Sequence, residues 1–349
     1  MSVKMNLNCP IPQLDFDRIT LGHGSGGVLT HKLLDSGVFD LLSNEILDKK
    51  HDGAFLNLEG EVAMSTDSFV VNPVFFPGGD IGELAINGTV NDLAMCGAIP
   101  KYLSLAFIIE EGLLMQDFWN ILVSIKAAAE RAGVKVVTGD TKVVERGKGD
   151  QIFINTTGIG TIHPKAKISD THIKNGDKII VSNSIANHGI AIMSVREGLE
   201  FETEILSDTC ALNEPALQLI ENFADGIHVM RDPTRGGLGT VLAEIAKDQK
   251  IGIDIAQTAI PVEEQVNGAC ELLGLDPLYV ANEGVFITIV EESIANEVCE
   301  KLKAFDTCAK ASVIGEIVDD HKGQVIIQSA IGGRRVVNML PGEQLPRIC

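Results

Sequence analysis

The last residue of the chain, Cys349, carries a thiol that could serve as a tethered acceptor of a chemical group. It follows the residues Pro346-Arg347-Ile348 at the end of the sequence. A proline disfavours a helical conformation of the preceding residue, and chain ends are the most mobile part of most domains. The α-carboxylate of the same residue disfavours the thiolate and so raises the pKa of the thiol. The tail therefore predicts either a mobile carrier thiol that needs help from other residues or a terminus without a chemical role.

Three aspartates, Asp67, Asp92 and Asp140, lie at or near the ends of predicted secondary-structure elements. We expect their carboxylates on the same side of a β-α pattern. Oxygen ligands of this kind suit Mg²⁺ bound with the phosphates of a nucleotide, and the nearby Lys142 adds a positive charge for phosphate. A single aspartate is more commonly a cap or turn residue, so both interpretations stay open at this point.

Two glycine-rich stretches each precede a predicted helix, one at 22–27 and one at 236–239. Glycines let backbone N–H groups approach a ligand, and a helix N-terminus favours an anion such as phosphate. The first stretch is not a P-loop, because no Lys-Ser or Lys-Thr follows it, and no clear strand precedes it. A phosphate site and an ordinary loop are both compatible with this pattern. Before the second stretch, Arg235 could bind an anion or simply pair with Asp232.

The composition limits the classes of partner and compartment. The chain has 48 acidic and 28 basic residues, a formal charge of -20, which would repel a phosphate backbone or an anionic membrane surface. Neither nucleic acid nor a membrane is therefore an expected partner. No apolar run is long enough for a signal peptide or a membrane span. The cysteines form no C-x-x-C pair and no zinc pattern, so we expect a reducing cytoplasm; they are Cys9, Cys96, Cys210, Cys270, Cys299, Cys308 and Cys349.

Short apolar strands alternate with amphipathic helices along the whole chain, which predicts an α/β or α+β fold. Helices are expected at 81–96 and 117–132, and the second leads into a strand at 134–137. The length of 349 residues exceeds one typical domain. The two halves share a loose plan of strands and helices, so we expect two packed units. The expected parts are an extension at 1–20, a first domain at 21–165, a second domain at 166–330 and a flexible tail at 331–349.

Taken together, the motifs resemble the HypE family of hydrogenase maturation proteins, which are carbamoyl dehydratases of the aminoimidazole-ribonucleotide synthetase (PurM-like) superfamily. The resemblance covers the chain from Leu21 to Cys349, and the terminal Pro-Arg-Ile-Cys separates this branch from other members of the superfamily. The motifs are Gly22-His23-Gly24-Ser25-Gly26-Gly27, Ser65-Thr66-Asp67-Ser68, Asn91-Asp92, Thr138-Gly139-Asp140-Thr141-Lys142, Asp232-Pro233-Thr234-Arg235-Gly236-Gly237, Ala281-Asn282-Glu283-Gly284 and Pro346-Arg347-Ile348-Cys349.

The resemblance implies a PurM-like two-domain architecture, a homodimer and a defined reaction. A HypF-type carbamoyltransferase would place a carbamoyl group on Cys349. ATP would then drive its dehydration to a thiocyanate, and the cyano group would go to the iron of [NiFe]-hydrogenase through a HypC-HypD-type complex. The implied catalytic residues are Cys349, Glu283 and Lys142. Those implied for ATP are Gly24, Ser25, Gly26, Gly27, Asp67, Asp92, Asp140, Asp232, Gly236 and Gly237, with Mg²⁺ on Asp67, Asp92 and Asp140.

Two features depart from the family pattern, and two other functions compete with the dehydratase. The extension contains Cys9, and Asn187 stands before His188 where the family is expected to have aspartate. A phosphotransferase of the selenophosphate-synthetase or thiamine-monophosphate-kinase type, acting on a free small molecule, is one alternative. It would retain turnover without Cys349. The other is a non-catalytic scaffold that binds nucleotide to time its contacts with partners.

Overall fold

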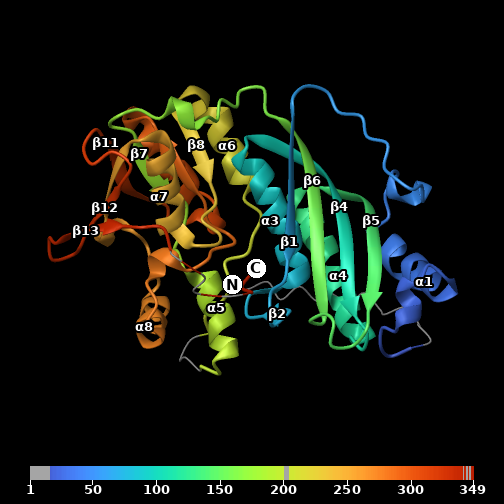
Figure 1. Cartoon of the computed structure of the whole chain (residues 1–349). Coiled ribbons are helices and arrows are strands. Elements are labelled where there is room, and N and C mark those ends of the chain that lie inside the picture. The colour runs from blue at the N-terminus through green and yellow to red at the C-terminus, as the bar shows by residue number, and fades with distance from the viewer. Residues whose placement is uncertain (1–15, 200–203, 341, 343–344, 346) are drawn as a thin grey trace.

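The computed structural model describes residues 16–199, 204–340, 342, 345 and 347–349 of the chain, and Cys9 lies outside them. Two β-sheets stand side by side, with helix α3 (Ile81–Met95) between them (Figure 1). The first sheet forms from residues 62–162 and the second from residues 178–337. No helix among the described residues is long and apolar enough to cross a membrane. The cysteines among these residues are all free thiols.

The first sheet has four strands in the order β1-β6-β4-β5. Only β4 and β5 run parallel to each other, and α4 connects them. Helices α3 and α4 pack together against this sheet. The elements of this domain are β1 (Val62–Phe69), β4 (Ala98–Glu110), α4 (Met115–Ala132), β5 (Lys135–Val144) and β6 (Ile152–Ile162). A small hairpin of β2 (Phe75–Phe76) and β3 (Gly79–Asp80) precedes α3.

The two faces of this sheet differ in exposure because successive strand residues point to opposite sides. Leu105 and Phe107 of β4 are buried in the core with the helices. Ile108 on the same strand is 47% exposed and Met64 of β1 is 69% exposed. Apolar side chains therefore lie on a sheet face that the described chain leaves uncovered.

A small unit precedes β1 and lies beside the edge strand β5 (Figure 1). It contains the turn Leu21–Gly24, helix α1 (Val28–Leu33), a π-helical turn Leu34–Phe39 and helix α2 (Asp40–Leu42). The glycine-rich stretch at 22–27 therefore precedes a helix, as predicted. That helix is only six residues long before the π-turn begins.

The second sheet has seven strands in the order β13-β12-β9-β11-β7-β10-β8. Helix α7 packs in the apolar core on one face, and α6 and α9 pack on the other. The strands are β7 (Lys178–Val181), β8 (Ile227–Arg231), β9 (Gly252–Ala256), β10 (Ile287–Val290), β11 (Ser312–Val318), β12 (Val325–Gln328) and β13 (Arg334–Val337). The helices are α5 (Asn187–Arg196), α6 (Asn213–Phe223), α7 (Gly237–Gln249), α8 (Glu264–Leu273) and α9 (Ala295–Lys303).

Three details of the sequence prediction need correction. The chain at 331–349 is not all tail, because β13 pairs along β12 as the edge strand of the second sheet. The extension at 1–20 does not end outside the fold either, since Ile19 is buried in the first core. The three aspartates do not all follow the prediction: Asp67 lies near the end of β1 and Asp92 in the last turn of α3, but Asp140 lies in the middle of β5.

Candidate active site

The C-terminal tail is docked between the two domains, and backbone hydrogen bonds hold it. The N–H groups of Val70 and Asn72 donate to the carbonyls of Cys349 (3.2 Å) and Arg347 (3.3 Å). The tail therefore lies alongside the segment that follows β1. The side chain of Ile348 is only 3% exposed and packs in the first core. In this conformation the terminal cysteine faces the protein rather than solvent.

Two side chains of α5 also bind the tail. His188 Nε2 lies 2.9 Å from the carbonyl oxygen of Ile348, and its Nδ1 lies 2.8 Å from Ser207 Oγ. Because a carbonyl can only accept, Nε2 carries the proton and Nδ1 accepts from the hydroxyl. Arg196 donates to the carbonyl of Arg347, whose own guanidinium pairs with Asp150. No local pattern marks His188 as a ligand of the tail, because its partner Ile348 lies 160 positions away in the chain. The sequence singled it out only as the neighbour of Asn187.

The docked thiol of Cys349 lies against the carboxyl group of Glu283. Glu283 is buried, at 5% exposure. Burial first, and then the charge of Glu283, raises the pKa of the Cys349 thiol, while nearby Arg235 acts in the opposite direction. Burial and the charges of Asp208, Asp232 and Asp67 raise the pKa of Glu283 well above its ordinary value. Both groups therefore favour their protonated forms in this state.

Carboxylates from both domains surround the thiol and Glu283. Ser65 Oγ donates to Asp92 Oδ2 at 2.5 Å, and burial with the charge of Asp67 raises the pKa of Asp92. Burial and the charge of Asp92 raise the pKa of Asp232 to about 7. Like charges this close disfavour their ionised forms unless a cation joins them. Arg235 forms no ion pair with Asp232, so the simple pairing considered from the sequence does not occur.

The second glycine-rich stretch enters this cluster at the start of α7. Gly236 and Gly237 both have positive φ, 79° and 63°, a region that favours glycine. A Cβ at Gly237 would lie 2.6 Å from the carbonyl oxygen of Leu278, so the backbone there packs too closely for a side chain. The N-terminus of this 13-residue helix thus stands beside Asp232 and Arg235.

The other half of the predicted site lies elsewhere, around the first glycine-rich stretch. Gly24, Gly26, Asp140 and Lys142 line a pocket of about 440 Å³ whose wall includes the apolar Phe39. Ser25 and Gly27 lie in the same loop, with Ser25 Oγ donating to the carbonyl of Gly22.

Lys142 pairs with Asp140 at 2.6 Å, which lowers the pKa of Asp140. Lys142 forms no salt bridge with Glu283, since its ammonium group pairs with Asp140 on the other side of the site.

Strand register shows how far apart the two halves are. Asp140 pairs across β4 and β6 with Ser68, in the row Asp140, Ala106, Asn155 and Ser68. Three strand spacings of about 4.8 Å separate the ends of such a row by roughly 14 Å. Asp67 is the neighbour of Ser68 and points to the opposite face. A single chain therefore does not bring Asp140 together with Asp67 and Asp92.

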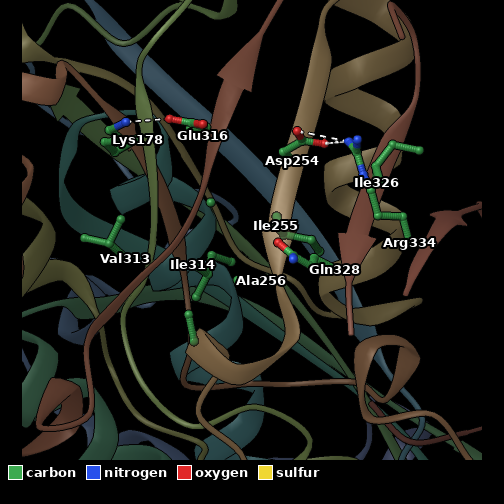
Figure 2. A pocket seen from close by; sticks show the side chains of 12 residues that line it. Lys178, Asp254, Ile255, Ala256, Val313, Ile314, Glu316, Ile326, Gln328 and Arg334 are labelled. Carbon is green, nitrogen blue, oxygen red and sulfur yellow. Dashed lines mark hydrogen bonds and ion pairs between the residues drawn. The ribbon is translucent and has the colours of Figure 1, made fainter. Parts of the chain in front are cut away.

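A groove of about 580 Å³ on the second sheet holds none of the predicted site residues. Its ion pairs, Lys178 with Glu316 and Asp254 with Arg334, leave its charges matched (Figure 2). No cluster of three or more His, Cys, Asp or Glu with metal-binding geometry occurs in the described part of the chain. The tail cluster is therefore the stronger candidate for chemistry.

Comparison with known proteins decides the family. The models of the AIR synthase related proteins match residues 50–162 with their N-terminal domain and residues 174–328 with their C-terminal domain. A carbamoyl dehydratase HypE of Azotobacter vinelandii is 48% identical over 332 residues, 95% of this chain and 97% of the relative. The chain belongs to the HypE family of carbamoyl dehydratases. A HypE of Cupriavidus necator is 45% identical over the whole of this chain and 99% of its own length.

Solved HypE structures share the whole architecture. A hydrogenase maturation protein HypE in complex with ATP has a TM-score of 0.91 and 46% identity, covering 94% of this chain and 99% of its own. The HypE chain of a HypE-HypF complex has a TM-score of 0.78 and 44% identity, covering 90% of this chain and all of its own. A thiamine monophosphate kinase of Aquifex aeolicus, at 15% identity and a TM-score of 0.57, shares the fold alone. The PurM-like two-domain fold and the HypE resemblance are thus confirmed.

Proposed function

We propose that this protein uses ATP to dehydrate the S-carbamoylated thiol of its own Cys349 to a thiocyanate, the source of a cyanide ligand for [NiFe]-hydrogenase. The observation that carries this proposal is the docked thiol that lies against the buried carboxyl group of Glu283. Membership of the HypE family supports the same reaction. A carbamoyl group on this sulfur would bring its amide next to the glutamate.

The reaction removes one oxygen and two N–H protons from the thiocarbamate in two steps. First, the carbonyl oxygen attacks the γ-phosphate of ATP, ADP leaves, and one N–H proton is lost to give a phosphorylated imidate. Second, the C–O bond breaks, the C≡N bond forms, and phosphate departs with the remaining N–H proton. We propose that Glu283, as a carboxylate, takes the first proton, because burial and neighbouring charges raise its pKa and so make its carboxylate a stronger base.

The carboxylates around the tail suit Mg²⁺ with ATP. Asp67, Asp92 and Asp232 do not form a complete metal site by themselves in the described residues, but Mg²⁺ held with the phosphates of ATP would need only one or two of these carboxylates. A bound cation would also relieve the repulsion among them. Mg²⁺ there would neutralise the charge of the triphosphate. The N-terminus of α7, at Gly236 and Gly237, adds backbone N–H groups suited to phosphate.

We assign the first glycine-rich loop, Asp140 and Lys142 to the nucleotide as well, through the pocket they line. Because Asp140 lies on another sheet face, it would join Asp67 and Asp92 on a metal only from a second chain. A direct proton transfer between Lys142 and the tail would likewise need Lys142 of a second chain.

A homodimer through the uncovered face of the first sheet would supply that second chain. This face exposes Met64 and Ile108, apolar side chains that a partner sheet would bury. The tail must also leave its docked position to be carbamoylated, because the thiol is turned toward Glu283. We propose a HypF-type carbamoyltransferase as the donor, since a HypE-HypF complex is among the similar structures. A HypC-HypD-type complex would accept the cyano group.

Phosphate release tests the proposal against its alternatives. We expect Mg-ATP to release phosphate only after Cys349 has been carbamoylated, in a ratio of one per tail. Cys349→Ala should abolish this release, whereas Cys299→Ala should retain it, because this other thiol-to-methyl change lies in α9, where the charged neighbours are Lys303 and Glu300. Turnover of free small molecules by Cys349→Ala would instead support a phosphotransferase. Nucleotide binding without any release would support the scaffold.

A further inference from the structure

Glu283 is held at its main chain on both sides, and the group that holds its N–H is a carboxylate. Asp208 Oδ1 accepts from the N–H of Glu283 at 3.0 Å. The carbonyl of Glu283 accepts from Asn91 Nδ2 at 3.3 Å. With both peptide groups fixed, the direction in which the glutamate side chain leaves the backbone is fixed as well. That direction decides whether its carboxylate meets Cys349.

The segment that carries Asp208 is anchored to both domains. The carbonyl of Cys210 accepts from Asn91 Nδ2 at 3.0 Å, and the N–H of Leu212 donates to Asn91 Oδ1 at 2.7 Å. Ser207, the residue before Asp208, binds the His188 side chain that holds the tail. Residues 207–212 thus bind Glu283 through Asp208 and bind His188, which holds the tail, through Ser207.

The contact between Asp208 and the glutamate loop is too close for any residue but glycine at position 284. A Cβ added to Gly284 would overlap with the carbonyl oxygen of Asp208. The other carboxyl oxygen of Asp208, Oδ2, is buried without a hydrogen-bond partner in the described residues. Burying such an oxygen costs stability, so the folded state gains little from this side chain beyond its contacts with the main chain of Glu283 and Gly284.

We propose that Asp208 is a positioning residue for the dehydration, which holds the main chain of Glu283 so that its carboxylate lies against the Cys349 sulfur. This inference rests on the proposed function, and it names a residue that has no motif around it. It does not make Asp208 a proton carrier. Its partner is Glu283, and any effect on the chemistry passes through that residue.

The charges around Glu283 agree with this role. The titratable groups that face it are Asp208, Asp232, Asp67 and the Cys349 thiol. Burial raises the pKa of Asp208 itself to about 7, while the N–H groups of Glu283 and Gly284 act in the opposite direction. Near neutral pH a large share of molecules therefore carries Asp208 in its neutral form. An asparagine resembles that form and keeps the accepting oxygen.

The test uses two substitutions of Asp208 in the full-length protein with a carbamoylated tail. Asp208→Ala removes the acceptor, and a misplacement of a reacting group by about 1 Å costs on the order of 100-fold in rate. We expect kcat for water loss to fall by about that factor, with the KM for ATP unchanged. Asp208→Asn should keep kcat within about tenfold of the parent, because its amide oxygen still accepts the N–H.

A double mutant shows whether Asp208 acts through the glutamate. If it does, Asp208→Ala lowers kcat no further in a Glu283→Gln background, because the two residues act as one unit. Asp177 provides the matched control for a purely structural effect. Its buried carboxylate also accepts a main-chain N–H, from Lys174 at 2.7 Å, but in the second domain away from the tail. Asp177→Ala should lower stability and leave kcat of the folded fraction unchanged.

A second readout keeps this inference separate from the proposed function. Alkylation of Cys349 by iodoacetamide needs no dehydratase chemistry, and we expect it to accelerate in both Asp208→Ala and Glu283→Gln, because each change removes the carboxylate from the sulfur. If carbamoylated parent protein loses no water with ATP, the proposed function fails and alkylation alone decides on Asp208. An unchanged kcat or alkylation rate in Asp208→Ala would overturn the inference. So would rate losses that multiply in full in the double mutant, or equal losses in the alanine and asparagine variants.

Discussion

Acidification should loosen the docked tail through a single imidazole, that of His188. This side chain is fully buried between Ser207 and the carbonyl of Ile348, and burial lowers its pKa from 6.5 to about 4. In the unfolded chain the imidazole binds a proton as the pH falls through its ordinary pKa. The folded state resists protonation until about pH 4, so stability is full above pH 6.5 and is lost as the pH falls below it.

The magnitude follows from the two pKa values. Between pH 7.5 and pH 5, linkage gives a loss of about 2 kcal/mol in the free energy of unfolding from this residue alone. Other groups contribute in the opposite direction, because buried Asp208 and Asp232 have raised pKa values and favour the folded state at low pH. The effect must therefore be measured as a difference from a variant that cannot titrate at this position.

His188→Gln is that variant, since its longer side chain places an amide where Nε2 of the imidazole donates to the carbonyl of Ile348. Urea unfolding followed by circular dichroism at pH 7.5 and pH 5 gives the free energy of unfolding of both proteins. We expect the parent to lose about 2 kcal/mol more than His188→Gln over this interval. An equal loss in the two proteins would refute the argument, because it would mean that His188 is protonated as easily in the folded state as in the unfolded chain.

Three further predictions concern separate parts of the structure. Gly284→Ala should destabilise the protein by more than about 3 kcal/mol, because the new methyl group overlaps with the backbone. Gly268→Ala, in open space within α8, should instead stabilise it by about 0.5–1 kcal/mol. Thermal unfolding of both variants checks this. Glu283→Gln should lower the pKa of the Cys349 thiol and speed its alkylation at pH 8 by about tenfold, and an unchanged rate would contradict the contact. Met64→Glu should turn the proposed dimer into a monomer in sedimentation velocity, since it places a charge on the uncovered sheet face.

The long elements were predictable because their patterns are strong. Helices predicted at 81–96 and 117–132 occur as α3 and α4 within a few residues of those bounds. The strand predicted at 134–137 continues to Val144, since the parallel β4 pairs with it along its whole length. Its Thr138-Gly139-Asp140 sequence lies beyond the predicted end of the strand. In the structure the carbonyl oxygen of Leu105 occupies the space where a Cβ of Gly139 would be, so the glycine allows β4 and β5 to pair there.

The site was predictable by residue type but not by arrangement. Cys349 and Glu283 were assigned from the family resemblance, and they do meet. The separation of Asp140 and Lys142 from the tail depends on strand order, which local sequence does not encode. Asp208 and His188 act through partners 75 and 160 positions away, so no local pattern marks them. Such contacts arise only when both domains have folded against each other.

The most direct test of the proposed dehydration is the intact mass of the Cys349 peptide. The protein is first carbamoylated by a HypF-type transferase with carbamoyl phosphate and Mg-ATP, and nucleotide is then removed, because the transferase itself consumes ATP. We predict a carbamoyl adduct on Cys349 that is stable without nucleotide and loses one water only when Mg-ATP is returned. A carbamoylated tail that keeps its mass with ATP would contradict the dehydration, and a tail that stays unmodified by a transferase active on a control acceptor would contradict the role of Cys349.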